Sequence, residues 1–562
     1  MTGADLVCRT LERLGVTHVF GLPGTQNVPL FEALRGAAFR TVVPTHEMGA
    51  AFMAAGYSRA SGRVGVLTTI PGPGFTYALT GLAEARLDSV PILYLVGQPA
   101  RGPGKRFQLQ AIDQAAIAGP LIKARLDVSR IEDFPRAVAE GHRLALAGEP
   151  GPVMVHYDPA LLGAETAAAV PAEAPGAGDG TSGIEGITET LELLGQAKRV
   201  VIFAGQGANG AGDLVRLLAE RLGAAVVTTT SARGVVAEDH PLVVQTDLRG
   251  AGGVNELVAA SDLVLALGVK FSHNGALGFQ LRLPEGRLVH VDESPESLGA
   301  NYPARLPIRA NVGAWIEELI HRAPAAPVGP GWAPGELDAH RARLAQSSVF
   351  PVEPRVAGAE PATFFAALRT ALPREACLVT DSGLHEMLAR RHFPVLAARG
   401  LIAPTDFQSM GFGLPAAIGA GLAAPERPVV LVTGDGGLAM CGLELLTAVK
   451  ERVTLPILVL NDGRYGLIRL DQIRQYGHTF GVDLPGLDFG ALAAAAGAGY
   501  AAPDEDLARA IRRALDTPGP TVIEVLVGDS RAMHRARAGA QARGAGRKLL
   551  PRWLIDRLKR LR

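Results

Sequence analysis

Short runs of valine, isoleucine and leucine recur along the whole chain and alternate with longer segments rich in alanine and leucine. Most of these runs are continuously apolar rather than alternating in polarity, as expected of strands that helices cover on both faces. Strands and helices that alternate in this way predict an α/β fold with parallel sheets. The expected strands span residues 16–21, 63–69, 91–97, 199–205, 224–230, 263–268, 287–292, 376–381, 428–435, 456–462 and 520–528.

Two stretches rich in proline, glycine and alanine interrupt this alternation and are expected to be linkers. They run from Pro171 to Gly186 and from His321 to Asp338. A chain of 562 residues is also too long for a single hydrophobic core. The sequence therefore predicts three doubly wound domains of ordinary size, at residues 1–170, 187–322 and 340–530, followed by a basic tail at 531–562.

Charge and cysteine content exclude several classes of protein. Basic and acidic residues number 55 each, so nothing in the net charge points to a nucleic-acid partner. The three cysteines are widely spaced and form no CxxC pair, which fits a reducing compartment better than a disulfide framework or a zinc site. The N-terminal segment lacks the apolar core of a signal peptide. We therefore expect a cytoplasmic protein.

The longest uncharged run is FQSMGFGLPAAIGAGLAAP, at residues 407–425. It is long enough to be considered as a membrane span. However, glycine and proline break the run, and Gln408 and Ser409 interrupt its apolar character. We expect a buried loop followed by a helix, without membrane insertion.

Two acids bracket a glycine-rich segment in the third predicted domain. One predicted strand ends in Gly434-Asp435-Gly436-Gly437, and the next ends in Asn461-Asp462. Glycines at a strand end let a ligand approach the backbone, and the helix that follows offers N–H groups to an anion. Two carboxylates beside such a site indicate Mg²⁺ completed by ligand phosphates. A capping Asp435 followed by an ordinary Asn-Asp turn explains the same residues without a metal.

A single carboxylate, Glu47, stands at the head of a segment otherwise made of alanine, glycine, phenylalanine and methionine. Burial in such surroundings would raise the pKa of Glu47, which is typical of functional sites. The alternative is an exposed acid at a helix N-terminus, which the helix dipole favours. From the segment alone, the exposed acid is the better interpretation.

Six motifs, in the same order along the chain, resemble the thiamine diphosphate (ThDP) enzyme family, in the branch of the acetolactate synthase large subunit and benzoylformate decarboxylase. The motifs are FGLPGTQNVPLFEAL, THEMGAAFMAAGYSRASG, TTIPGPGFTYALTGLAEARLDSVPILYLVGQ, ARGVVAEDHPL, DFQSMGFGLPAAIGAGLAAP and the GDG…ND segment. The resemblance covers nearly the whole chain. It implies a pyrimidine-binding first domain, a Rossmann-like central domain and a diphosphate-binding third domain.

The resemblance also implies how the cofactor is held. Glu47 matches the acid that hydrogen-bonds N1′ of the cofactor's pyrimidine and so favours the tautomer that deprotonates the thiazolium carbon. Met410 matches the bulky apolar residue beneath the cofactor, and the main-chain carbonyl of Gln408 matches the acceptor for the 4′-amino group. The remaining implied residues are the Mg²⁺ ligands Asp435, Asp462 and the main-chain carbonyl of Arg464, and the diphosphate cradle of Leu384, His385, Gly436 and Gly437.

In this family the glutamate and the metal site belong to different subunits, because the first domain of one chain faces the third domain of its partner. The resemblance therefore implies a homodimer as the smallest active unit, and a tetramer is compatible with it. A chain that has lost catalysis and serves as a regulatory paralogue is an alternative from another class. The intact set of Glu47, Asp435 and Asp462 argues against that alternative.

The substrate is implied to be a small 2-oxo acid, with 2-acetolactate formed from pyruvate as the leading reaction. Decarboxylases of the benzoylformate type carry a histidine where this chain has Ile70, and acetolactate synthases often carry a tryptophan where it has Leu470 and Asp471. Simple decarboxylation and cleavage of a 2-hydroxyacyl-CoA therefore stay open as alternatives. The residues expected to line the pocket are Thr25, Phe75, Phe107 and one of Gln108 or Gln110, although each phenylalanine fits an ordinary core equally well.

The central domain contains a GxGxxG sequence from Gly205 to Gly210. A dinucleotide site needs an acid about twenty residues later, at the end of the second strand, but that strand is followed by Ser231. Synthases of this family often hold FAD here with an arginine-rich stretch. This chain has Lys270 and no matching arginine beside it, which argues against FAD.

The predicted tail carries eleven lysines and arginines and one acid, Asp556. Leu550, Leu554, Leu558 and Leu561 recur at helical spacing. A terminal helix docked on its own dimer explains this pattern. A lid for an anionic substrate such as a coenzyme A thioester, or a helix for an anionic surface, explains it too.

Overall fold

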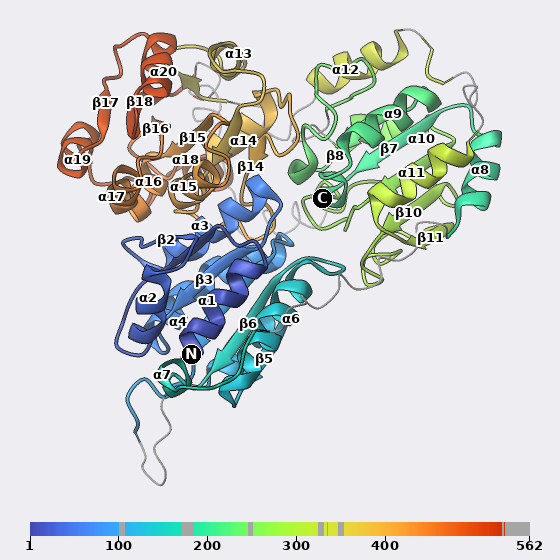
Figure 1. Cartoon of the computed structure of the whole chain (residues 1–562). Coiled ribbons are helices and arrows are strands. Elements are labelled where there is room, and N and C mark those ends of the chain that lie inside the picture. The colour runs from blue at the N-terminus through green and yellow to red at the C-terminus, as the bar shows by residue number, and fades with distance from the viewer. Residues whose placement is uncertain are drawn as a thin grey trace, which may run out of the picture.

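The computed structural model describes residues 1–99, 107–170, 185–245, 251–323, 331–333, 335–346, 353–530 and 533. Over these residues the chain forms three parallel-sheet bodies, seen in Figure 1 as a blue, a green and an orange lobe. Most of the first predicted linker, and residues 324–330 and 334 of the second, lie outside the described residues, and so does the predicted tail apart from Met533. The predicted domain boundaries stay a prediction.

The N-terminal body is built on a sheet with strand order β2-β1-β3-β4-β6-β5, in which every described pair is parallel. Its inner strands are buried along their whole length, which explains their continuous apolar sequence. The elements are α1 (Gly3–Arg13), β1 (His18–Gly21), α2 (Val28–Arg35), β2 (Arg40–Val42), α3 (Glu47–Ser61), β3 (Gly65–Thr69), α4 (Pro73–Leu87), β4 (Ile92–Gly97), α5 (Gln114–Ala118), β5 (Ala124–Val128), α6 (Phe134–Leu146), β6 (Pro152–Tyr157) and α7 (Ala160–Gly163).

The central body has the parallel order β11-β10-β9-β7-β8. Trp315, on a covering helix, is fully buried in its core. The elements are α8 (Ile187–Gln196), β7 (Val200–Ala204), α9 (Gly212–Leu222), β8 (Ala225–Thr228), α10 (Ala251–Ala259), β9 (Leu263–Leu267), β10 (Leu288–Asp292), β11 (Leu306–Arg309), α11 (Val312–Arg322) and α12 (Glu336–Gln346).

The C-terminal body has the order β12-β18-β16-β15-β13-β14, with β17 also paired to β18. Its described pairs are parallel except at one edge, where the short β12 runs antiparallel to β18. The elements are β12 (Arg355–Val356), α13 (Pro361–Ala371), β13 (Cys377–Thr380), α14 (Leu384–His392), β14 (Leu401–Ile402), α15 (Gly413–Ala423), β15 (Val429–Gly434), α16 (Asp435–Cys441), α17 (Leu445–Lys450), β16 (Leu455–Asn461), α18 (Gly466–Tyr476), α19 (Phe489–Ala496), β17 (Gly499–Ala501), α20 (Leu507–Asp516) and β18 (Pro520–Gly528).

Helices α3 and α15 join the first and third bodies through small residues. A side chain added at Gly56 of α3 would run into the backbone carbonyl of Ala416, and one added at Gly419 of α15 would run into that of Met53. Glycine and alanine thus let the two backbones approach closely, and each apolar helix buries the other. The uncharged run at residues 407–425 is therefore a loop and a core helix. None of the described helices has the length and apolar character needed to cross a membrane.

Candidate active site

A cavity of about 290 Å³ opens at the carboxyl edge of the C-terminal sheet. The loops after β13, β15 and β16 reach it, as expected for ligand sites of open α/β sheets. Every residue that the sequence assigned to the metal or to the diphosphate cradle lines this one cavity, together with both loop residues expected under the cofactor. These residues are Leu384, His385, Gln408, Met410, Asp435, Gly436, Gly437, Asp462 and Arg464.

Asp435 and Asp462 meet because their strands are neighbours. β15 pairs in parallel with β16, with Gly434 opposite Leu460, so both acids leave the sheet at the same edge. Burial, followed by the charge of Asp435, raises the pKa of Asp462 to about 6. Burial likewise raises the pKa of Asp435. Two partly buried acids that disfavour each other's ionisation would be stabilised by a cation between them.

These donors fit Mg²⁺ bound together with a phosphate ligand. Over the described residues there is no cluster of three or more histidines, cysteines or acids that could hold a metal alone. Mg²⁺ typically binds one or two carboxylates and takes its other ligands from water and substrate phosphates. Two carboxylates beside an open cavity match that pattern.

The glycines after β15 allow close packing at the wall of the cavity. The sequence suggested a glycine turn before the next helix, but the structure begins α16 at Asp435, so Gly436 and Gly437 lie in its first turn. A Cβ on Gly436 would stand 3.0 Å from the Tyr465 ring, and one on Gly437 would stand 2.9 Å from the Asp381 carboxylate. A side chain on Gly436 would press on Tyr465, which lines the cavity, and one on Gly437 would collide with the buried Asp381.

His385 presents an unused polar atom in the same cavity. The residue is buried, and its Nε2 atom has no hydrogen-bond partner among the described residues. Burial lowers the pKa of His385 to about 4, so the ring is neutral at pH 7. A buried ring nitrogen without a partner is costly unless a ligand satisfies it. This orphaned atom is open to a ligand that enters the cavity.

The loop that carries Gln408 and Met410 has a strained backbone. Gln408 has φ of 58°, in the left-handed region that non-glycine residues rarely adopt. Asp381, directly after β13, accepts hydrogen bonds of 3.0 Å from both Gly411 N–H and Gly413 N–H. Sequence reasoning missed Asp381, although an acid followed by Ser-Gly at a strand end was an available signal.

A second group of predicted residues gathers in the N-terminal body. Glu47 is the first residue of α3 and is half-buried, so neither predicted environment describes it fully. Its Oε1 atom lies 3.3 Å from the position of a Cβ on Gly74. Ile70 lies against Gly24 and Gly74, 2.5 Å and 2.7 Å from Cβ positions built there. Gly74, in the first turn of α4, thus leaves space for the Glu47 carboxylate.

The four predicted substrate residues have different surroundings. Thr25 is exposed, and Gln110 accepts a 2.7 Å hydrogen bond from Gln26 Nε2 while lying against Gly72. Phe75 is fully buried and stacks on Tyr94, as a core residue does. The side chain of Phe107 is fully exposed.

The two groups do not meet within one chain. Among the described residues that line the C-terminal cavity, none is Glu47 or one of the four predicted substrate residues. A second copy of the chain is therefore needed if Glu47 and the metal pair are to act on one ligand, as the resemblance implies.

Comparison with protein families assigns all three bodies to one enzyme type. Residues 1–117 match the thiamine pyrophosphate enzyme N-terminal TPP binding domain, residues 187–319 match the central domain, and residues 381–525 match the C-terminal TPP binding domain. The chain belongs to the thiamine pyrophosphate enzyme family. It is a ThDP-dependent enzyme, and thiamine pyrophosphate is another name for ThDP.

Relatives of this thiamine pyrophosphate enzyme match it over nearly its whole length. It is 30% identical to the acetolactate synthase isozyme 1 large subunit of Escherichia coli over 541 residues, which cover 94% of each chain. It is 32% identical to a probable 2-ketoarginine decarboxylase of Pseudomonas aeruginosa over 536 residues, 93% of this chain and 94% of that one. The acetolactate synthase large subunit of Lactococcus lactis is 30% identical over 480 residues, 83% of this chain and 82% of that one. These relatives support the acetolactate synthase branch.

The central domain of this thiamine pyrophosphate enzyme gives FAD no support. A cavity of about 270 Å³ lies between its glycine turns and the N-terminal domain. Lys270, the cation in the segment that would hold a flavin, donates hydrogen bonds to the Leu87 carbonyl and to Glu149. Asp292 and Glu293 also line the cavity. The diphosphate of FAD is negatively charged. The two acids would repel it, and the lysine is already paired with Glu149.

Proposed function

We propose that this enzyme uses ThDP and Mg²⁺ to decarboxylate a 2-oxo acid and to join the remaining acyl carbon to a second molecule, with pyruvate converted to 2-acetolactate as the leading reaction. The observation that carries the proposal is the cavity in which Asp435, Asp462 and two glycines meet. Likeness to acetolactate synthases over most of the chain supports the choice of reaction.

The residues of the cavity would hold the two ends of the cofactor differently. We assign Mg²⁺ to Asp435, Asp462 and the carbonyl of Arg464. We assign the diphosphate to the glycine turn, Leu384 and His385. Main-chain and apolar contacts from Gln408 and Met410 would orient the pyrimidine. When bound, ThDP would supply a carbon nucleophile and, in its thiazolium ring, an acceptor for the electron pair released on decarboxylation.

Glu47 would hold a proton at the pyrimidine of the cofactor. As the first residue of α3 its carboxylate lies in the favourable field of a helix N-terminus. It is bordered by Gly74 and lies near the buried Tyr94, so it can be enclosed once a partner covers it. Thr25, Ile70 and Gln110 lie on the same side and are our candidates for contact with the 2-oxo acid.

Product analysis with pyruvate tests the reaction. We expect 2-acetolactate to form only when both ThDP and Mg²⁺ are present, and to disappear when the metal is chelated. Acetaldehyde without 2-acetolactate would instead favour a decarboxylase that does not join two molecules. The similarity to a probable 2-ketoarginine decarboxylase makes 2-ketoarginine the second substrate to assay.

We expect a homodimer whose two active sites lie between subunits. Exposed apolar side chains border both groups of site residues, including Tyr77 against His46 and Leu443 just after α16.

A complementation experiment tests this arrangement. Co-expressed Glu47→Gln and Asp435→Ala chains form heterodimers in which one site has both intact halves, so about a quarter of all sites should regain activity. No regain above the single variants, or full activity of a monomer by light scattering, would contradict shared sites.

A further inference from the structure

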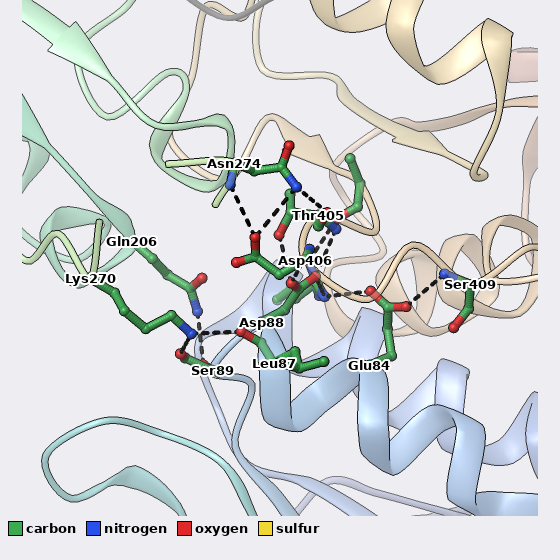
Figure 2. Close-up of polar contacts among 12 residues, drawn as sticks. Glu84, Leu87, Asp88, Ser89, Gln206, Lys270, Asn274, Thr405, Asp406 and Ser409 are labelled. Carbon is green, nitrogen blue, oxygen red and sulfur yellow. Dashed lines mark hydrogen bonds and ion pairs between the residues drawn. The ribbon is translucent and has the colours of Figure 1, made fainter. Parts of the chain in front are cut away.

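The C-terminal end of α4 lies where all three domains meet, as Figure 2 shows. Glu84 and Asp88 are buried there, at 0% and 3% exposure. Asp88 accepts hydrogen bonds of 2.9 Å from Thr405 N–H and 2.8 Å from Asp406 N–H. This end of the helix therefore holds a loop of the C-terminal domain.

At this junction, Glu84 contacts the loop that carries Gln408 and Met410. Its Oε2 atom accepts a 3.0 Å hydrogen bond from Ser409 N–H, across 325 residues of sequence. Ser409 lies between Gln408 and Met410, both of which line the C-terminal cavity. The backbone carbonyl between Gln408 and Ser409 belongs to the same peptide unit as the N–H that Glu84 binds. Fixing that N–H therefore fixes the orientation of the carbonyl.

The charges around Glu84 indicate that its role is to accept a hydrogen bond rather than to carry charge. The Arg59 guanidinium lies 2.6 Å from Asp88 and 3.8 Å from Glu84. Burial, followed by the charge of Asp88, raises the pKa of Glu84 to about 8. Burial acts to raise the pKa of Asp88 as well, but Arg59 and the hydrogen bonds of Thr405 outweigh it and lower that pKa. Arg59 is thus neutralised mainly by Asp88, which lies closer to it, and burial favours the protonated form of Glu84.

We propose that Glu84 is a positioning residue for the cofactor, which acts from the N-terminal domain through Ser409 N–H to preset the Gln408 carbonyl. The strained φ of 58° at Gln408 requires such support from its surroundings. Asp381 holds the far side of the same loop through Gly411 and Gly413. The inference rests on the proposed cofactor site and adds a residue that does not line the cavity.

A matched pair of variants isolates the acceptor. Glu84→Gln and Glu84→Met both remove the ionisable group and nearly match glutamate in length, but only glutamine can accept the Ser409 hydrogen bond. We expect E84M to raise the ThDP concentration needed for half-maximal thermal stabilisation by about tenfold, in line with one lost hydrogen bond to a buried N–H. E84Q should stay within about threefold of wild type.

Glu149→Gln is the control, because Glu149 accepts hydrogen bonds from Ser89 and Lys270 at the same junction without contacting the loop. It should leave the ThDP response unchanged. Equal ThDP responses of E84M and wild type, or an E84Q variant as impaired as E84M, would overturn the inference. A wild-type protein that ThDP and Mg²⁺ do not stabilise would overturn the proposed cofactor site and this inference together.

Hydrogen exchange of residues 405–411 keeps the inference testable if E84M does not fold. We expect slow exchange in the wild-type protein and in E84Q before ThDP is added, because the hydrogen bond to Ser409 N–H is already formed. Fast exchange of this loop in the cofactor-free wild type would show that Glu84 does not preset it.

Discussion

Glu47→Gln is expected to lower turnover by about 10²–10⁴-fold, the usual contribution of a positioned proton-transfer group. Glutamine nearly matches glutamate in size, but it cannot hold or release a proton at the cofactor's pyrimidine. The ThDP response in a thermal melt should change little, because Glu47 does not line the cavity assigned to the diphosphate and metal. Steady-state rates with saturating ThDP and Mg²⁺ measure the first effect, and melts of the same samples measure the second.

Glu32→Gln is a suitable control, since Glu32 is an exposed acid in the same domain and pairs only with Arg35 among the ion pairs of the described residues. It should behave as wild type. Unchanged turnover in the Glu47→Gln enzyme would mean that the proposed role of Glu47 is wrong. A chain that binds ThDP but turns over no 2-oxo acid would instead favour a regulatory paralogue.

Asp435→Ala is expected to abolish stabilisation by ThDP and Mg²⁺. At a ligand concentration 100-fold above Kd, binding stabilises the folded state by about 2.7 kcal/mol. In a domain of about 150–250 residues, such as the predicted third domain, that corresponds to a shift in Tm of about 5–10 °C. The wild-type protein should show this shift, and the variant should not. Asp471→Asn is the control, because Asp471 is a half-buried acid that pairs with Arg474 on α18 and does not line the cavity. A full shift in the Asp435→Ala protein would place the metal elsewhere.

When the metal is chelated, Asp462 should make the stability of the folded protein depend on pH. Because burial raises the pKa of Asp462 to about 6, the folded chain holds a proton there that the unfolded chain has released. The resulting stability is complete below the ordinary aspartate pKa of about 4 and is lost as the pH rises towards 6. Asp462→Asn should remove this part of the pH dependence in melts with chelator present. An identical pH profile in both proteins would contradict the assignment.

The sequence predicted the inner strands well because burial on both faces leaves a continuous apolar run. β5 was missed because its exposed and buried residues alternate and include Arg125 and Asp127. β2 and β14 were missed because they contain only three and two residues. The acid-glycine motifs predicted the cavity because they sit at the ends of neighbouring parallel strands.

The roles of Glu84 and Asp381 could not be predicted in the same way. Glu84 acts on a residue 325 positions away, and its own helix shows only a buried acid in an apolar pattern. Asp381 acts on a loop that follows another strand. Such roles depend on how domains pack, which a local pattern does not encode.

The close packing of α3 against α15 restricts how this enzyme can be recombined. Gly56 and Gly419 each leave room for only the backbone of the opposite helix, so residues 47–61 and 413–423 form a matched surface. A chimaera that takes its first domain from a relative would join two surfaces that had not been selected together. Exchanging both helices as one unit keeps the surface intact and leaves the pocket residues free to vary.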